Sequence, residues 1–107
     1  MSISFDDFQK MEIRIGKIES AERVEGSDKL IKLQINLGSE KRQIVAGIAD
    51  QFEADQLVGK QIPILANLEP KKFRGIESQG MILVAEDDNK LTLLIPENNV
   101  SSGTRVR

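Results

Sequence analysis

Apolar residues at every second position are the feature that most restricts the fold of this chain of 107 residues. Residues 31–37 read Ile-Lys-Leu-Gln-Ile-Asn-Leu, which is the period of a β-strand with one buried face. The same alternation runs through residues 11–15 but slips after Gly16, because Lys17 stands where an apolar residue is due. We therefore expect a glycine bulge at Gly16, which lets one long strand bend from one sheet into another.

Short apolar runs between clusters of turn residues continue this β pattern. They predict strands over residues 41–46, 61–68, 80–86 and 91–95, the last two joined by a hairpin turn. Residues 47–59 predict a short helix or helical turns, and the spacing of Ser4 and Asp7 predicts a short N-terminal helix with a capped start. Together these elements predict an all-β fold, a five-stranded Greek-key barrel of the OB type.

The length of the chain suits a single domain. Within it we expect an N-terminal helix in residues 1–10, the barrel in residues 11–86 and a C-terminal β extension in residues 87–107. This extension is too apolar for a solvated tail, so it either packs back on the barrel or forms an interface. Its apolar residues are Leu91, Leu93, Leu94, Ile95, Val100 and Val106. We expect them to form the interface of a homodimer.

Two missing residue types exclude most catalytic chemistry. The chain contains no cysteine and no histidine, so it lacks disulfides, thiolates, the commonest zinc ligand and the commonest general base. We expect no enzyme activity, cofactor or metal. No apolar run approaches the ~18 residues of a membrane span, and the N-terminus lacks the features of a secretory signal. The sequence therefore predicts a cytoplasmic chain without membrane contact.

Residues 67–81 carry the strongest indication of function. Lys71, Lys72 and Arg74 surround Phe73, so three cations and one aromatic ring occupy four positions between two predicted strands. One proline and two glycines are expected to hold this segment out of regular structure, at one mouth of the barrel. A short basic turn can be merely a solvated loop with a hydrophobic plug. Its place on a strand scaffold favours instead the binding of a polyanion, with a base stacked on Phe73.

The charge distribution decides whether a chain of net charge −2 can bind nucleic acid. Residues 9–48 hold eight cations against six acids, and residues 71–74 hold three against none. Acids gather instead at residues 6–7, 50–55 and 86–88. Such a chain can bind a phosphate backbone on one side, weakly and with a strong dependence on salt.

Several blocks of the sequence together resemble the tRNA-binding domain family. These blocks are Phe8 to Gly16, Gly26 to Leu30, Lys41-Arg42 with Val45 to Gly47, Asn67 to Gly75 and Ser78 to Met81. Members of this family occur as free homodimeric proteins, as the C-terminal module or β subunit of methionyl-tRNA synthetases, and attached to other synthetases. The resemblance covers nearly the whole chain, although Glu12 stands where the family more often has aspartate.

The resemblance implies an OB barrel that binds tRNA by shape, dimerises through its C-terminal extension and has no catalytic activity. It also implies partnership with the catalytic domain of a methionyl-tRNA synthetase. Carried over by position, the expected tRNA contacts are Lys29, Arg42, Asn67, Lys71, Lys72, Arg74, Ser78 and Met81. Arg14 and Lys32 are further candidates, on the exposed faces of their strands.

Each of these residues also has a purely structural interpretation. Lys29 could pair with Asp28, Arg14 could pair with Glu12, Met81 could belong to the core, and Asn67 could cap a turn. The rival function is that of a dimeric OB-fold chaperone or peptide-binding module, since a chaperone group shares this fold and dimer. The basic pattern of residues 71–81 favours tRNA.

Overall fold

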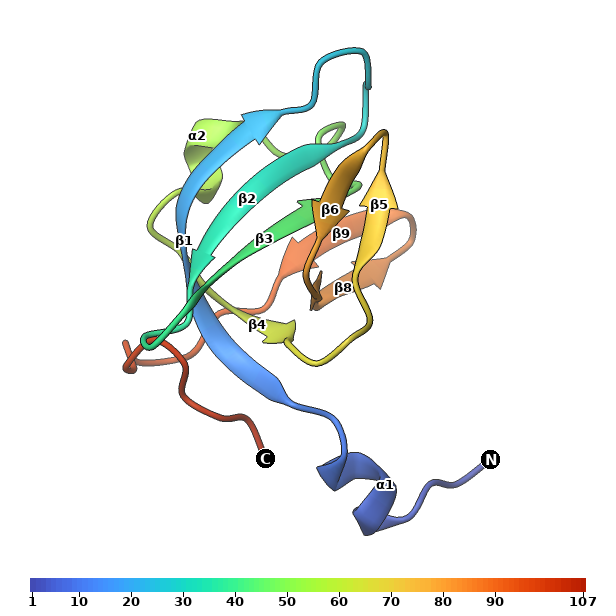
Figure 1. The fold of residues 1–107 in the computed structure, drawn as a ribbon, viewed down its shortest axis with the longest axis vertical. Coiled ribbons are helices and arrows are strands. Elements are labelled where there is room, and N and C mark those ends of the chain that lie inside the picture. Colours follow the sequence, from blue (N-terminus) through green and yellow to red (C-terminus); the bar gives the residue numbers. More distant parts are fainter.

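The computed structural model describes all 107 residues and contains nine strands and two short helices. Neither helix is long or apolar enough to cross a membrane. The helices are α1 (Phe5–Gln9) and α2 (Ala54–Leu57). The strands are β1 (Ile13–Arg23), β2 (Ile31–Asn36), β3 (Lys41–Ala46), β4 (Gln61–Leu65), β5 (Lys71–Phe73), β6 (Ile76–Ser78), β7 (Met81–Ile82), β8 (Val84–Asp87) and β9 (Lys90–Leu93) (Figure 1).

Five antiparallel strands in the order β3-β2-β1-β4-β7 form the main sheet. The sheet curls until β3 lies beside β7, which nearly closes it into a barrel. Two separate hairpins, β5–β6 and β8–β9, are added to this barrel (Figure 1). The predicted all-β, OB-like barrel with short helices is therefore confirmed.

The long strand β1 pairs with two strands, as a strand that bends from one sheet into another should. Its first half pairs with β4 and its second half with β2, and the change falls at Lys17. A Cβ on Gly16 would lie 2.3 Å from Cγ2 of Ile35, so the close approach of β2 requires glycine here. The bulge itself lies between Ile18 and Ser20, and its prediction at Gly16 was wrong. Glu19 is the extra residue, and its exposed carboxylate has polar partners in Asn36 on β2 and Lys41 on β3.

The core is aliphatic and lies inside the barrel. Ile31, Leu33 and Ile35 on β2 are completely buried, because the alternation of this strand turns every second side chain inward. Ile62 and Ile64 on β4 do the same from the other side of β1. The barrel is therefore a rigid support from which the connections between strands project.

The C-terminal segment largely packs back on the barrel. Leu91 and Leu93 on β9 pack against the core. Further on, the chain runs beside β1, where the backbone N–H of Gly103 donates to the carbonyl of Ile15 (2.7 Å) and the N–H of Val106 donates to that of Ile13 (2.8 Å). A pair of apolar side chains at the end of β9 stays in solvent, since Leu94 and Ile95 are 42% and 53% exposed.

Candidate nucleic-acid interface

The basic segment forms a regular β-hairpin. Strands β5 and β6 pair antiparallel, from Lys71 opposite Ser78 to Phe73 opposite Ile76. The two residues of the tip, Arg74 and Gly75, have positive φ angles of 51° and 82°, as a tight hairpin turn requires. The prediction that residues 67–81 lack regular structure was therefore wrong. Gly75 forms the turn of the hairpin, and Pro70 directly precedes its first strand.

Side chains fasten this hairpin to the barrel strand β3. The Ser78 hydroxyl accepts a hydrogen bond from the Val45 backbone N–H (3.0 Å) and donates to the Gly80 carbonyl (3.0 Å). The amide of Gln43 donates to the Glu77 carbonyl (2.9 Å). The hairpin is thus held at its base while its tip extends along the outside of the barrel (Figure 1).

The tip of the hairpin meets the connection between β1 and β2. A Cβ on Gly26 would lie 3.0 Å from Nη2 of Arg74, so the guanidinium group rests over this turn. In OB barrels the connection between the first two strands and the one between the fourth and fifth flank the usual ligand face. Here these connections are residues 24–30 and residues 69–78. We call these two segments together the hairpin–turn surface.

Ion pairing separates the cations of the chain into two groups. Six lysines and arginines have a carboxylate within 4.0 Å: Lys10, Arg14, Arg23, Lys32, Lys41 and Arg42. None of these six lies on the hairpin–turn surface. Its cations Lys29, Lys71, Lys72 and Arg74 are all exposed and have no such partner. These four cations are therefore free of ion pairs, although the same two segments also carry the carboxylates of Glu25, Asp28, Glu69 and Glu77.

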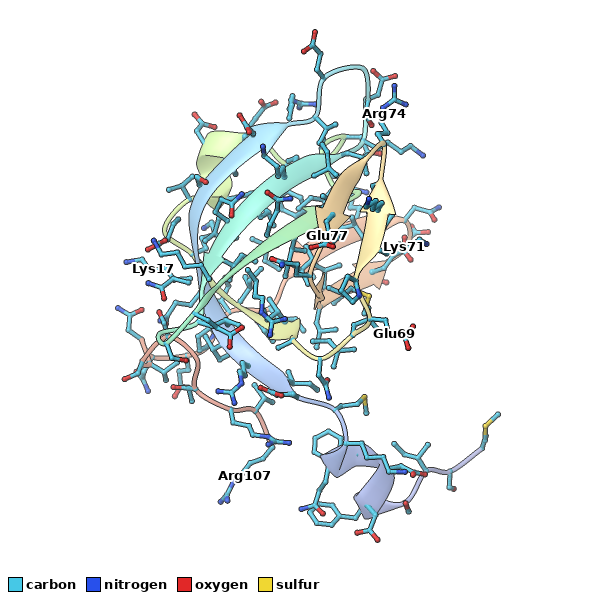
Figure 2. All side chains as sticks on the ribbon, in the orientation of Figure 1. Lys17, Glu69, Lys71, Arg74, Glu77 and Arg107 are labelled. Carbon is cyan, nitrogen blue, oxygen red and sulfur yellow. The ribbon has the colours of Figure 1, made fainter.

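The three hairpin cations point in different directions. Lys71 and Phe73 share one face of β5, and the ammonium group of Lys71 lies 5.1 Å from the centroid of the Phe73 ring. Lys72 lies on the opposite face, across from Glu77. Arg74 is at the tip, near the top of the molecule in Figure 2, with Lys71 further down. The charge surrounds the hairpin rather than facing one plane.

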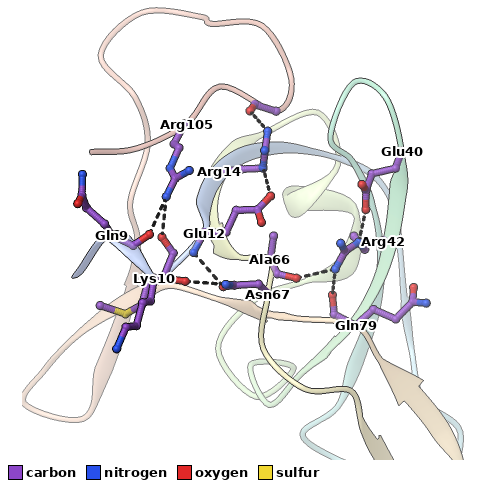
Figure 3. Close-up of polar contacts among 12 residues, drawn as sticks. Gln9, Lys10, Glu12, Arg14, Glu40, Arg42, Ala66, Asn67, Gln79 and Arg105 are labelled. Carbon is purple, nitrogen blue, oxygen red and sulfur yellow. Dashed lines mark hydrogen bonds and ion pairs between the residues drawn. The ribbon is translucent and has the colours of Figure 1, made fainter. Parts of the chain in front are cut away.

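Two predicted contacts, Arg42 and Asn67, bind backbone groups of the fold (Figure 3). Nη1 of Arg42 donates to the carbonyls of Ala66 (2.6 Å) and Gln79 (3.1 Å), on either side of the hairpin. The Asn67 side chain accepts from the Glu12 N–H (2.8 Å) and donates to the Lys10 carbonyl (2.7 Å). Asn67 thus ties the end of β4 to the segment after α1.

Arg14 and Lys32 are engaged as well. Nε of Arg14 lies 2.5 Å from the Glu12 carboxylate, the alternative pairing expected from the sequence, and Nη1 donates to the Gly103 carbonyl (2.9 Å). Lys32 pairs with Glu22 at 2.7 Å. Both cations are already partly neutralised, unlike those of the hairpin–turn surface.

The remaining candidates differ in accessibility. Lys29 does not form the alternative ion pair with Asp28, so its charge is free. Met81 is 44% exposed and does not belong to the core. Ser78 is only 3% exposed and bonded on both sides, so its hydroxyl holds the hairpin in place and offers RNA no surface.

Sequence reasoning missed a small pocket at the base of the hairpin. Its volume is about 210 Å³, and its apolar lining comes from four separate places in the chain: Val45, Leu68, Phe73 and Met81. Lys71 and Glu69 also line it. These residues meet only when the hairpin folds over β3, so no pattern along the sequence could have grouped them.

Comparison with known proteins gives consistent matches. Residues 13–105 match the profile of the family described as "Putative tRNA binding domain". The methionine–tRNA ligase of Archaeoglobus fulgidus is 57% identical over 104 residues, which are 97% of this chain but 16% of the ligase. The chain thus spans a small part of such a relative.

Two solved structures match over the full chain. The MetRS-related protein from Pyrococcus horikoshii has a TM-score of 0.96 at 41% identity, and the match covers 100% of this chain and 99% of that one. The chaperone CsaA from Bacillus anthracis has a TM-score of 0.89 at 28% identity and covers 100% of both chains.

Proposed function

This chain belongs to the tRNA-binding domain family, and from that membership we propose that it binds tRNA through the hairpin–turn surface. The observation that carries the proposal is the gathering of Lys29, Lys71, Lys72 and Arg74 on two adjoining connections, none of them paired with a carboxylate. Contacts to phosphate groups dominate the binding, and the shape of the folded RNA decides which surface fits.

The chain is a tRNA-binding domain rather than a catalytic one, as the sequence predicted. The matching family profile covers residues 13–105, and the match to the ligase covers only 16% of the length of that enzyme. Joined to a methionyl-tRNA synthetase, such a domain would raise the local concentration of tRNA near the catalytic part. A free form would bind tRNA by itself. In either arrangement we expect it to work in the cytoplasm.

The proposed contacts differ in strength. Lys29, Lys71, Lys72 and Arg74 make the main phosphate contacts. Arg42 contributes less, because its guanidinium group is paired with Glu40 and bonded to the carbonyls of Ala66 and Gln79. Arg14, Lys32 and Asn67 contribute less, because their polar groups are already bonded within the chain.

The C-terminal segment, residues 87–107, is the proposed interface of a homodimer. Its exposed Leu94 and Ile95 support this assignment. So does the adjoining groove of about 560 Å³ against α2, whose lining includes Phe52, Leu93 and Ile95. Two copies would present two hairpin–turn surfaces to one RNA and add avidity.

A peptide-binding function is the second candidate. It is favoured by the full-length similarity to the chaperone CsaA and by the apolar lining of the hairpin pocket. This function predicts binding of unfolded peptides with little dependence on salt. The unpaired cations of the hairpin have no role in it, which is why we rank it below tRNA binding.

A double substitution tests the proposal. Lys71→Ala with Arg74→Ala should weaken the binding of unrelated tRNAs by similar factors, and should lower the slope of log K against log salt by about 2. The matched control is Lys17→Ala with Arg107→Ala, which removes the same charge from unpaired positions far from the hairpin (Figure 2). An equal loss in the control, or a loss for one tRNA species alone, would contradict binding by shape at this surface.

A further inference from the structure

A small pocket with largely apolar walls lies at the base of the hairpin, beside the cation Lys71. We propose that it receives one unstacked base of the bound RNA while Lys71 contacts a phosphate of the same nucleotide. This inference rests on the proposed tRNA binding and adds a named contact to it.

The walls of the pocket are apolar and accessible. Leu68 and Met81 are each 44% exposed, and Val45 and Phe73 complete the apolar part of the lining. Its volume of about 210 Å³ lies below the ~300–1,000 Å³ of pockets that take whole small ligands. A pocket of this size suits a single planar ring system and excludes a helix or a complete nucleotide.

The chemistry of the lining selects the base over the other parts of a nucleotide. A phosphate group inside the pocket would lose its hydration against apolar walls and would be repelled by the carboxylate of Glu69. A base is flat and uncharged, and it can stack on the ring of Phe73. Because every base has a π-face, such a contact tolerates any sequence and agrees with recognition by shape.

Lys71 is placed to bind the phosphate attached to that base. Its ammonium group now lies over the Phe73 ring, 5.1 Å from the centroid, and has no carboxylate within 4.0 Å. A cation–π contact at an exposed site is weak, so the lysine can leave the ring when a base replaces it. The ammonium group then remains beside the pocket, where the phosphate follows the base.

The pocket exists before any ligand arrives. Ser78 fixes its floor by bonding both Val45 and Gly80. Gly80, which also lines the pocket, has a φ of 133°, and a Cβ there would lie 2.8 Å from the Leu65 carbonyl oxygen, so this part of the lining packs tightly against the end of β4. A preformed cavity binds a base without the cost of ordering its walls.

Abasic RNA tests this inference with the full-length chain. The probes are a short single-stranded oligoribonucleotide and an abasic oligomer of equal length with the same phosphates. Wild-type protein should bind the first more tightly, by roughly 5- to 150-fold if one base stacks. Phe73→Ala should remove this difference by weakening the binding of the base-containing oligomer to the level of the abasic one. Phe5→Ala, at an exposed ring on α1, is the matched control and should preserve the difference.

Phe73→Leu is the second variant, in case alanine disturbs the fold. Leucine keeps an apolar side chain at the hairpin but removes the flat ring, so the preference for bases should again fall. Circular dichroism checks the fold of each variant.

Two results would overturn the inference. Equal affinity of the wild-type chain for both oligomers, with tRNA binding intact, would reject the base pocket and leave the proposed function standing. Displacement of both oligomers by a short apolar peptide, prevented by Phe73→Ala, would assign the pocket to a peptide side chain. A wild-type chain that binds no tRNA would instead refute the proposed function itself.

Discussion

Some polar side chains that were predicted to contact RNA form hydrogen bonds within the fold. Sequence alone could not separate these roles, because the amide of Asn67 can bind a sugar edge or a backbone with the same atoms. The structure shows both ends of this amide bonded to the segment after α1. Arg105 supports the same segment by donating to the carbonyls of Gln9 (3.1 Å) and Met11 (3.3 Å) (Figure 3).

Asn67→Ala should therefore lower stability more than it lowers affinity. The loss of two exposed hydrogen bonds predicts a decrease of about 1–2 kcal/mol in the free energy of unfolding. Urea denaturation measures this change. Affinity for tRNA should fall less than in the Lys71→Ala, Arg74→Ala variant. Unchanged stability with a large loss of affinity would make Asn67 a direct RNA contact instead.

Glu19 at the bulge of β1 gives a pH-dependent prediction. The hydrogen bond from Lys41 (2.9 Å) is the main cause that lowers the pKa of Glu19, and a bond from Asn36 (3.2 Å) assists it. Since the folded pKa lies below the unfolded one, this contribution to stability is present above the unfolded pKa. It disappears as the pH falls through the folded pKa.

Lys41→Ala should raise the pKa of Glu19 toward its usual value, as followed by NMR titration of its carboxyl group. Lys17→Ala should raise this pKa less, because Lys17 acts only through its charge at a distance. An unchanged pKa of Glu19 in Lys41→Ala would show that the ion pair is absent in solution.

At the scale of elements, alternation predicted the long strands but not the short hairpin. Strand β2 was evident from its inward Ile31, Leu33 and Ile35. Strands β5 and β6 have only three residues each, too few to display a period of two, and they are held by contacts with β3. The position of the basic segment was therefore predictable, whereas its conformation and its pocket were not.

The packing of the C-terminal segment requires glycine at position 103. Gly103 has a φ of 92°, and a Cβ there would lie 2.2 Å from the Leu37 carbonyl oxygen. Gly103→Ala should lower the free energy of unfolding by about 2–4 kcal/mol, measured with denaturant. The control Gly47→Ala has open space around its Cβ and should be nearly neutral. Similar stability of both variants would contradict the close packing of this segment against Leu37, which directly follows β2.

Across the whole molecule, the sequence revealed where positive charge is concentrated but not where it is cancelled. The sequence places eight cations in residues 9–48, four of which were candidate contacts beside the three of the hairpin: Arg14, Lys29, Lys32 and Arg42. Folding then pairs Lys32 with Glu22 on the neighbouring strand, and Lys41 on β3 with Glu19 on β1, across the intervening β2. Pairing of this kind depends on strand register, so it could not be read from the charges alone. The unpaired cations on the hairpin–turn surface, Lys29, Lys71, Lys72 and Arg74, are a smaller and more local group.

The proposed dimer predicts a solution mass of twice the 11.9 kDa of one chain, measured by light scattering after size exclusion. Ile95→Asp should reduce this mass to that of a monomer, because it puts a charge into the apolar interface. It should also lower tRNA affinity by removing avidity. Ile3→Asp, at a side chain that is 61% exposed, is the control and should leave the dimer intact. A wild-type monomer at micromolar concentration would refute the interface.

The most direct test of the hairpin–turn surface is an NMR titration of the ¹⁵N-labelled chain with unlabelled tRNA at moderate salt. We predict that the largest changes of backbone signals fall in this surface, residues 24–30 and 69–78. Changes concentrated instead on α2 and the end of β9, with the hairpin signals unaffected, would contradict the central claim that this surface binds tRNA.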